Sequence, residues 1–177
     1  MPAKISVVQM YLKRGTDKKE SLKHALDLMD QAADDGSQAV CFPDYFLTDC
    51  PTVDDTEASI RKIAEPIPGP VTEAFGEKAR KYGMYVIAGS IVELGEDNKL
   101  YSTAPIIGPD GMLVGKVRKS HPENAPAKYE LACGITPGNG EYEVFETKIG
   151  KVGVMLDMDG TAVEVPRILG LKGAEII

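Results

Sequence analysis

The sequence has no tryptophan and only two histidines and three cysteines among its 177 residues. His24 and His121 are far apart in the chain, and no group of cysteines and histidines has the spacing of a zinc site. We therefore expect no bound metal, and no motif indicates a cofactor. An odd number of cysteines without a regular spacing is typical of reduced thiols, which predicts a cytoplasmic protein.

Long apolar stretches and a surplus of positive charge are also missing. No apolar run approaches the roughly 20 residues that a membrane-spanning helix needs. The first residues have neither the apolar core nor the cleavage site of a signal peptide. The formal net charge is −7, which argues against a nucleic-acid binder because phosphate contacts require a basic surface. We therefore expect neither a nucleic-acid nor a membrane partner.

The chain does have the length and composition of a single globular domain over residues 1–177, with an apolar fraction of 43%. Apolar residues at helical spacing predict helices over residues 17–35, 57–65, 71–82 and 163–172. Short β-branched or alternating runs predict strands over residues 4–10, 38–42, 84–92, 100–107, 112–117, 142–146 and 151–157. The mixed order of these elements predicts an α/β fold with helices packed on a sheet.

Two stretches do not follow the regular pattern. Residues 120–141 are a long irregular segment rich in proline, glycine and asparagine, and so long a loop is usually functional or disordered. Residues 174–177 begin a strand directly after a helix, and such a strand should continue into a sheet. We therefore expect the chain to be incomplete at its C-terminal end.

Several segments together resemble the nitrilase superfamily of carbon–nitrogen hydrolases. The strand-end motif of that family, Phe-Pro-Glu followed by an aromatic residue, is similar to residues 41–47 (CFPDYFL). Further similar segments, in family order, are residues 100–111 (LYSTA to GPDG), 117–121 (VRKSH), 136–147 (TPG to YEVFET) and 150–177. Each motif alone is weak, but their common order and spacing are specific.

This resemblance implies a fold and an activity. The family fold is a four-layer α-β-β-α sandwich, and a complete domain is longer, so its C-terminal part is expected to be missing from this chain. Family members hydrolyse small nitriles, amides or carbamoyl compounds and commonly dimerise, which implies such a small-molecule substrate and a homo-oligomer. Their triad of glutamate, lysine and cysteine combines a base, an oxyanion-stabilising cation and a thiolate nucleophile.

Carried over position by position, the triad falls on Asp44, Lys119 and Asp157. Asp44 takes the position of the general base and is one methylene shorter than glutamate. Lys119 matches the lysine that stabilises the oxyanion, and Glu130 is a candidate for a second carboxylate. By residue type alone, Lys119 also fits an ordinary surface lysine, Asp44 a turn residue and Glu130 a solvated loop residue.

Asp157 departs from the family because it stands where the nucleophilic cysteine is expected. Carboxylate attack on an amide would give an anhydride, which is less stable than a thioester, so we expect an inactive or impaired hydrolase. Cys133 is a disfavoured substitute because it lies in the irregular segment rather than at the strand end.

Two alternatives remain open. Residues 152–161 (VGVMLDMDGT) also resemble the first motif of haloacid-dehalogenase-like phosphatases, in which Asp157 would attack phosphorus and Asp159 would act as acid and base with Mg²⁺. Only 18 residues follow Asp159, which leaves little room for the later motifs of that family. The other alternative is a nitrilase-like protein with a non-catalytic binding or assembly role.

Overall fold

The computed structural model describes residues 3–11, 15, 17–125 and 128–177. The strands are β1 (Ile5–Val7), β2 (Ala39–Cys41), β3 (Tyr85–Ile87), β4 (Ile91–Leu94), β5 (Leu100–Ile107), β6 (Leu113–Arg118), β7 (Val144–Thr147) and β8 (Gly150–Gly153). The helices are α1 (Lys18–Asp34), α2 (Glu57–Ile63), α3 (Pro70–Tyr82) and α4 (Glu164–Leu171), with a 3₁₀ turn, η1, at Asp157–Gly160.

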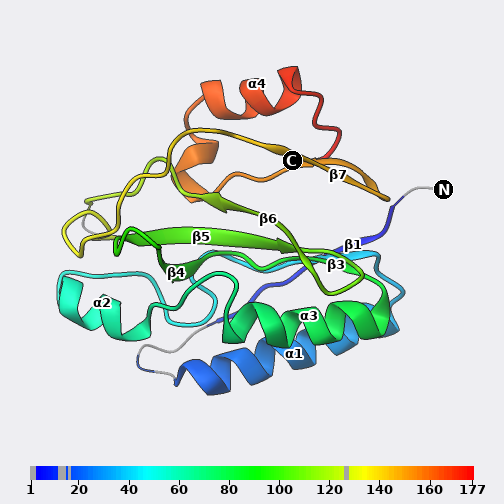
Figure 1. The fold of residues 1–177 in the computed structure, drawn as a ribbon, viewed down its shortest axis with the longest axis horizontal. Coiled ribbons are helices and arrows are strands. Elements are labelled where there is room, and N and C mark those ends of the chain that lie inside the picture. Colours follow the sequence, from blue (N-terminus) through cyan, green and yellow to red (C-terminus); the bar gives the residue numbers. More distant parts are fainter. Residues whose placement is uncertain (1–2, 12–14, 16, 126–127) are drawn as a thin grey trace.

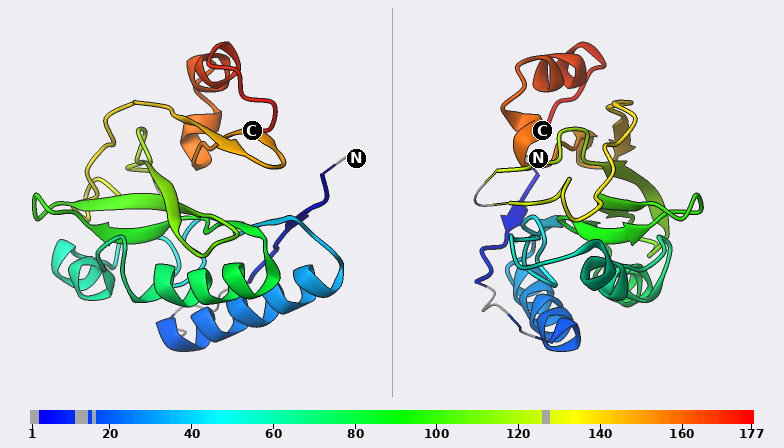
Figure 2. Two further views of the ribbon diagram at one scale, coloured as in Figure 1. Left: turned by 45° about the vertical axis from the view of Figure 1, so that its right-hand side comes forward. Right: turned by 90° about the vertical axis from the view of Figure 1, so that its left-hand side faces the viewer.

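The elements form four layers in the order helix, sheet, sheet, helix (Figure 1). Helices α1 and α3 cover one face of a six-stranded sheet, and the two-stranded sheet of β7 and β8 lies over its other face with α4 outermost. Figure 2 shows the same stacking from two further directions. This is the predicted α-β-β-α layer order.

The six-stranded sheet brings the ends of distant segments together. Strands β1, β2 and β3 are parallel neighbours, whereas β5 is antiparallel to β3, β4 and β6. The long β5 pairs with β3 through Ile106 and Ile107 and with β4 through residues 100–103. The segments that follow β2 and β6 can therefore approach each other across the sheet.

The single strand predicted over residues 84–92 is wrong, because the structure has β3 and β4 with a break between them. Gly89 has φ +43°, and a Cβ there would lie 1.9 Å from the carbonyl oxygen of Pro43. Only glycine fits so close a backbone approach. The break turns Ser90 toward the segment that follows β2, where its hydroxyl oxygen accepts a hydrogen bond from the backbone N–H of Tyr45.

The second hairpin is also shifted from its predicted position. Its strands are β7 and β8, so residues 154–157 are not part of a strand, and η1 follows instead. Residues 174–177 form no regular strand. They contribute an isolated parallel bridge between Ile176 and Val152. The segment 120–141 is irregular, as predicted, with turns and isolated bridges in its described part.

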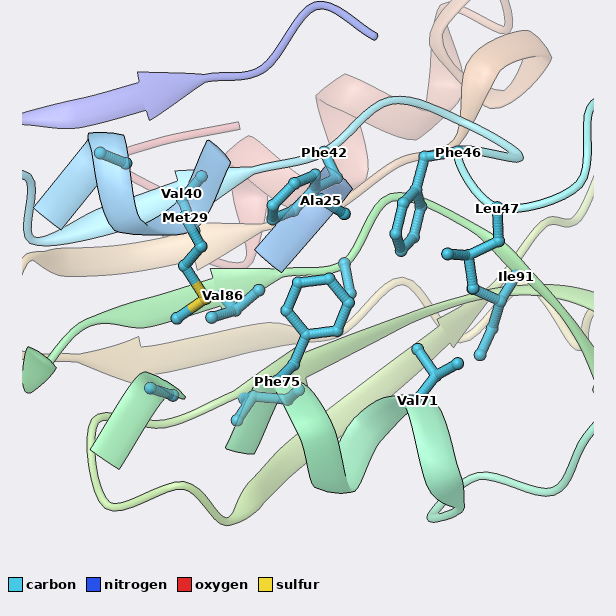
Figure 3. Packing of buried hydrophobic residues seen from close by; sticks show 14 of the residues in the cluster. Ala25, Met29, Val40, Phe42, Phe46, Leu47, Val71, Phe75, Val86 and Ile91 are labelled. Atoms are coloured by element: carbon cyan, nitrogen blue, oxygen red, sulfur yellow. The ribbon is translucent and has the colours of Figure 1, made fainter. Parts of the chain in front are cut away.

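Four clusters of buried apolar residues form the core of the described part of the chain. Between the helices and the large sheet, three phenylalanines pack against one another with ring centroids 5.1 to 5.7 Å apart (Figure 3). Those rings belong to Phe42, Phe46 and Phe75. Asp44 lies in a short segment between Phe42 and Phe46. Because both phenylalanines are buried, they anchor this segment to the core. A second cluster lies between the sheets and includes Ile106, Phe145 and Val152.

Within the described residues, no helix combines the length and the apolar character required to cross a bilayer. The three cysteines are unpaired.

Candidate active site

The structure brings Asp44, Lys119 and Asp157 together. Asp44 follows β2, Lys119 directly follows β6, and Asp157 begins the turn η1 after β8. The ammonium nitrogen of Lys119 lies 2.8 Å from Asp157 Oδ2 and 4.0 Å from Asp44 Oδ2. Lys119 is 0% exposed, so it is no surface lysine. Three segments that are distant in the sequence therefore place three charged groups around one point.

Glu130 belongs to the same cluster. It is completely buried, so the interpretation of it as a solvated loop residue is wrong. Its carboxylate accepts hydrogen bonds from Lys119 Nζ at 2.8 Å, Tyr45 Oη at 2.7 Å and the backbone N–H of Glu123 at 2.7 Å. These three donors satisfy the buried carboxylate, and its contact with Lys119 is one of those that favour the ammonium form of that lysine.

The backbone at Asp157 adopts an unusual conformation. Its φ of +45° lies in the left-handed region, which a residue with a side chain adopts at a cost of about 1–2 kcal/mol. Such outliers are typical of functional positions, where a sharp turn at a strand end projects one side chain. Asp157 here projects toward Lys119 from a turn rather than from a regular strand.

Asp159 connects the turn η1 to the segment after β6. It is buried and accepts hydrogen bonds from the backbone N–H groups of Ser120 and His121 at 3.2 and 2.9 Å. Its Oδ1 also lies 2.7 Å from His121 Nδ1. Because these contacts join position 159 to positions 120 and 121, they fix the distance between Lys119 and Asp157.

Sequence reasoning missed several polar residues of the cluster, among them Lys128 and Ser90. Lys128 Nζ donates to Asp157 Oδ2 at 2.7 Å and to Asp44 Oδ2 at 3.2 Å. Ser90 donates its hydroxyl proton to Asp44 Oδ1. Lys128 lies in an irregular segment without periodicity, and Ser90 lies at the break that was predicted as continuous strand. The turn-forming Gly89 was the one available signal for Ser90.

The electrostatics of the cluster follow from these contacts. Burial alone would raise the pKa of Asp157, but the hydrogen bonds from Lys119 and Lys128 outweigh it and hold that pKa well below its ordinary value. Burial opposes the ammonium forms of both lysines, yet the hydrogen bond with Asp157 and the other nearby carboxylates raise the pKa of each. Burial and the neighbouring Asp157 raise the pKa of Glu123. Both lysines are therefore cations, and Asp157 is a carboxylate.

Cys133 does not join this cluster. Its sulfur is buried against the carbonyl oxygens of Thr52 and Asp55, at 3.8 and 3.5 Å. Burial raises the pKa of the Cys133 thiol, which lowers its thiolate fraction. These contacts argue against Cys133 as a substitute nucleophile.

The geometry also bears on the phosphatase alternative. That mechanism needs Asp159 free to act as acid and base beside Mg²⁺, but its carboxylate is buried and accepts from backbone N–H groups. Among the described residues, no group of three or more histidine, cysteine, aspartate and glutamate side chains is arranged to hold a metal ion. The contacts of Asp159 thus suit a structural role.

Comparisons with known proteins agree with the fold. A family model described as carbon–nitrogen hydrolase matches residues 4–177. The omega-amidase NIT2 of Xenopus tropicalis is 36% identical over 165 residues, which are 90% of this chain and 57% of that protein. A carbon–nitrogen hydrolase of Helicobacter pylori has a TM-score of 0.81 at 24% identity, over 98% of this chain and 58% of that chain.

A second solved structure, Saccharomyces cerevisiae Nit3, is a member of branch 10 of the nitrilase superfamily. It has a TM-score of 0.80 at 25% identity, over 97% of this chain and 61% of that chain. The chain thus spans 57% to 61% of the length of these three proteins. Together these likenesses confirm the predicted nitrilase-like α/β fold.

Proposed function

This chain belongs to the carbon–nitrogen hydrolase family, and we propose that it carries the site of a small-amide hydrolase whose covalent step is blocked by Asp157. The substrate class is a small amide, nitrile or carbamoyl compound with a non-peptide carbon–nitrogen bond. The similar omega-amidase supports the amide within that class. In this proposal Asp44 stands at the position of the general base, Lys119 at that of the oxyanion stabiliser, and Asp157 at that of the nucleophile.

The observation that carries the proposal is the contact of Lys119 with Asp157 at 2.8 Å. A carboxylate at this point lacks a thiol, and its attack on an unactivated amide leads to an anhydride. It also occupies the ammonium group that would otherwise stabilise a developing oxyanion. Asp157 therefore has two effects: the site lacks its thiol nucleophile, and the ammonium group of Lys119 is paired with a carboxylate.

A second candidate is a non-catalytic role in binding or assembly. The observation that favours it is the ion pairing of Asp157 with two lysines, because these lysines then have a partner within the protein instead of a substrate. The two candidates differ in one respect, which is whether the rest of the site still supports acyl transfer once a thiol is present.

The test is to restore the thiol. The native chain, Asp157→Ala, Asp157→Cys and Asp157→Cys/Asp44→Glu would be incubated with acetamide and propionamide. Ammonia release and the intact protein mass would be followed. We expect no ammonia above background from the native chain and from Asp157→Ala. We expect the Asp157→Cys variants to release ammonia as the introduced thiol is acylated, with water then hydrolysing the thioester. Ammonia release should be faster when Asp44→Glu restores the reach of the base.

The outcomes separate the possibilities. An acyl adduct on the introduced thiol supports the blocked hydrolase. A folded Asp157→Cys/Asp44→Glu variant with neither adduct nor ammonia release favours the non-catalytic role. If the native chain hydrolyses the amides at enzyme-like rates, the blocked step is refuted. In that case, loss of activity in Asp157→Ala would indicate a working carboxylate nucleophile, and retained activity would place the active site elsewhere.

A further inference from the structure

Lys128 occupies a place in the cluster that the family resemblance does not assign. Its ammonium group lies 2.7 Å from Asp157 Oδ2, 3.2 Å from Asp44 Oδ2 and 3.9 Å from Glu123 Oε2. Lys119 and Lys128 contact the same oxygen of Asp157. Two ammonium groups thus converge on the point where the proposed reaction needs its nucleophile.

The backbone holds Lys128 in this place. Ala125 and Lys128 exchange two backbone hydrogen bonds of 2.9 Å each, and Tyr129 donates from its backbone N–H to the carbonyl of Pro51 at 3.0 Å. The side chain of Lys128 is 20% exposed. A lysine that is fixed on both sides and mostly buried differs from the long, freely rotating side chains that make weak surface ion pairs.

Lys128 also contacts the carboxylate of Asp44. Ser90 donates to one oxygen of that carboxylate, and Lys128 donates to the other. Both Asp44 and Lys128 line a hollow of about 280 Å³ that also has Phe46 and Cys50 in its wall. Lys128 therefore lies beside the proposed base in the wall of a hollow that can admit a small molecule.

We propose that Lys128 is a positioning residue of this site, which holds Asp44 in place and supplies a second positive charge to the anion at position 157. In the native chain that anion is the Asp157 carboxylate. In a chain with a cysteine at this position it is the thiolate. The inference rests on the proposed function, because it takes position 157 as the place of the nucleophile.

The charged groups that face position 157 come from three segments. They are Asp44 after β2, Lys119 after β6, and Glu123 and Lys128 in the segment 120–141. Glu130 acts on position 157 through Lys119. On the turn itself, Asp159 is engaged by backbone N–H groups and His121. Of these groups, the two cations alone favour a negative charge at position 157.

The test measures the acidity of a thiol at this position. In the Asp157→Cys background, the rate of alkylation by iodoacetamide would be followed against pH, with peptide mass spectrometry to separate the introduced thiol from the three natural ones. Adding Lys128→Met should move the midpoint of this profile to higher pH by about one unit, because the thiolate loses a neighbouring cation. Lys128→Arg should move the midpoint back toward its original value.

The matched control is Lys148→Met, which removes an exposed lysine between β7 and β8. A Lys128→Met midpoint that stays unchanged overturns the inference, as does an equal shift from Lys148→Met. If Lys128→Met does not fold, Lys128→Gln supplies the same comparison with a polar side chain. The readout is independent of turnover. Absence of both an acyl adduct and ammonia release would count against the proposed function, whereas an unchanged midpoint would count against Lys128.

Discussion

Asp157 shows how one residue can change which anion the two lysines of a site contact. Its carboxylate is held by two ammonium groups in a left-handed backbone conformation, so its contacts offset the strain of its backbone. A cysteine at the same place would have the same two cations beside its thiolate. The surroundings therefore suit an anion at this position, and the chemistry depends on which anion stands there.

The pH dependence of stability provides a first residue-scale prediction. The pKa of Asp157 is lower in the folded chain than its ordinary unfolded value of about 4, so this group stabilises the fold above that pH and loses its contribution as the pH falls. Urea unfolding should show the native chain more stable than Asp157→Asn near pH 7. This difference should shrink progressively as the pH falls below about 4.

Asp27→Asn, at an exposed position of α1, serves as the control for the loss of one surface carboxylate in this measurement. A difference between the native chain and Asp157→Asn that grows on acidification would contradict the sign of the pKa shift.

Glu130 leads to a second residue-scale prediction. Glu130→Ala would leave Tyr45 Oη and the backbone N–H of Glu123 without their buried acceptor and would remove one of the anions around Lys119. We expect the free energy of unfolding to fall by about 2–3 kcal/mol, measured by urea denaturation at pH 7. Glu130→Gln preserves the shape and should lose less. A change below about 0.5 kcal/mol in Glu130→Ala would show that this network does not stabilise the fold.

At the scale of elements, the break between β3 and β4 positions a side chain of the candidate site. It brings Ser90 to Asp44 while β3 and β4 continue to pair with the same long strand, β5. The close approach of Gly89 to Pro43 makes the break possible. One glycine thus connects the geometry of the sheet with the position of a candidate site residue.

Replacement of this glycine tests the connection. Gly89→Ala introduces both a left-handed residue and an overlap with Pro43, so the free energy of unfolding should fall by about 3 kcal/mol or more. Gly83, after α3, has φ +65° but open space around it. Gly83→Ala should therefore cost only about 1 kcal/mol. Equal losses in urea denaturation would show that the contact with Pro43 does not matter.

At the scale of the whole molecule, the outer layer leaves apolar side chains uncovered. Val163 and Leu171, at the two ends of α4, are 75% and 77% exposed, and Ile177 is 52% exposed. Apolar side chains that are exposed together as one patch are typical of surfaces that meet another protein. Their exposure on one layer motivates the prediction that a second copy of the chain contacts this layer.

We therefore expect the chain to self-associate through this layer. Sedimentation velocity should show a concentration-dependent shift toward dimers or larger species, and Leu171→Ser/Val163→Ser should reduce it. Met112→Ser, on the turn between β5 and β6, is the control, because Met112 is exposed but lies outside the α4 layer. A monomer at all concentrations would refute the prediction.

The sequence by itself determined the α/β class, the layer order and most of the elements, because these depend on local spacing of apolar residues and on motifs in family order. It also singled out Asp44, Lys119, Glu130 and Asp157, since these positions follow from matching motifs along the chain. It placed β3 and β4 in one strand, because the contact between Gly89 and Pro43 joins residues 46 positions apart in the sequence.

Only the tertiary structure decided which charges meet. Lys128 lies in an irregular segment without a repeating pattern of apolar residues, so nothing in the local sequence distinguishes it from a solvated lysine. Its partners Asp44 and Asp157 lie 84 and 29 positions away in the chain. Burial of Glu130 and the lowered pKa of Asp157 likewise depend on donors from other segments. Electrostatic interactions depend on distance in space, and the packing of the layers sets that distance.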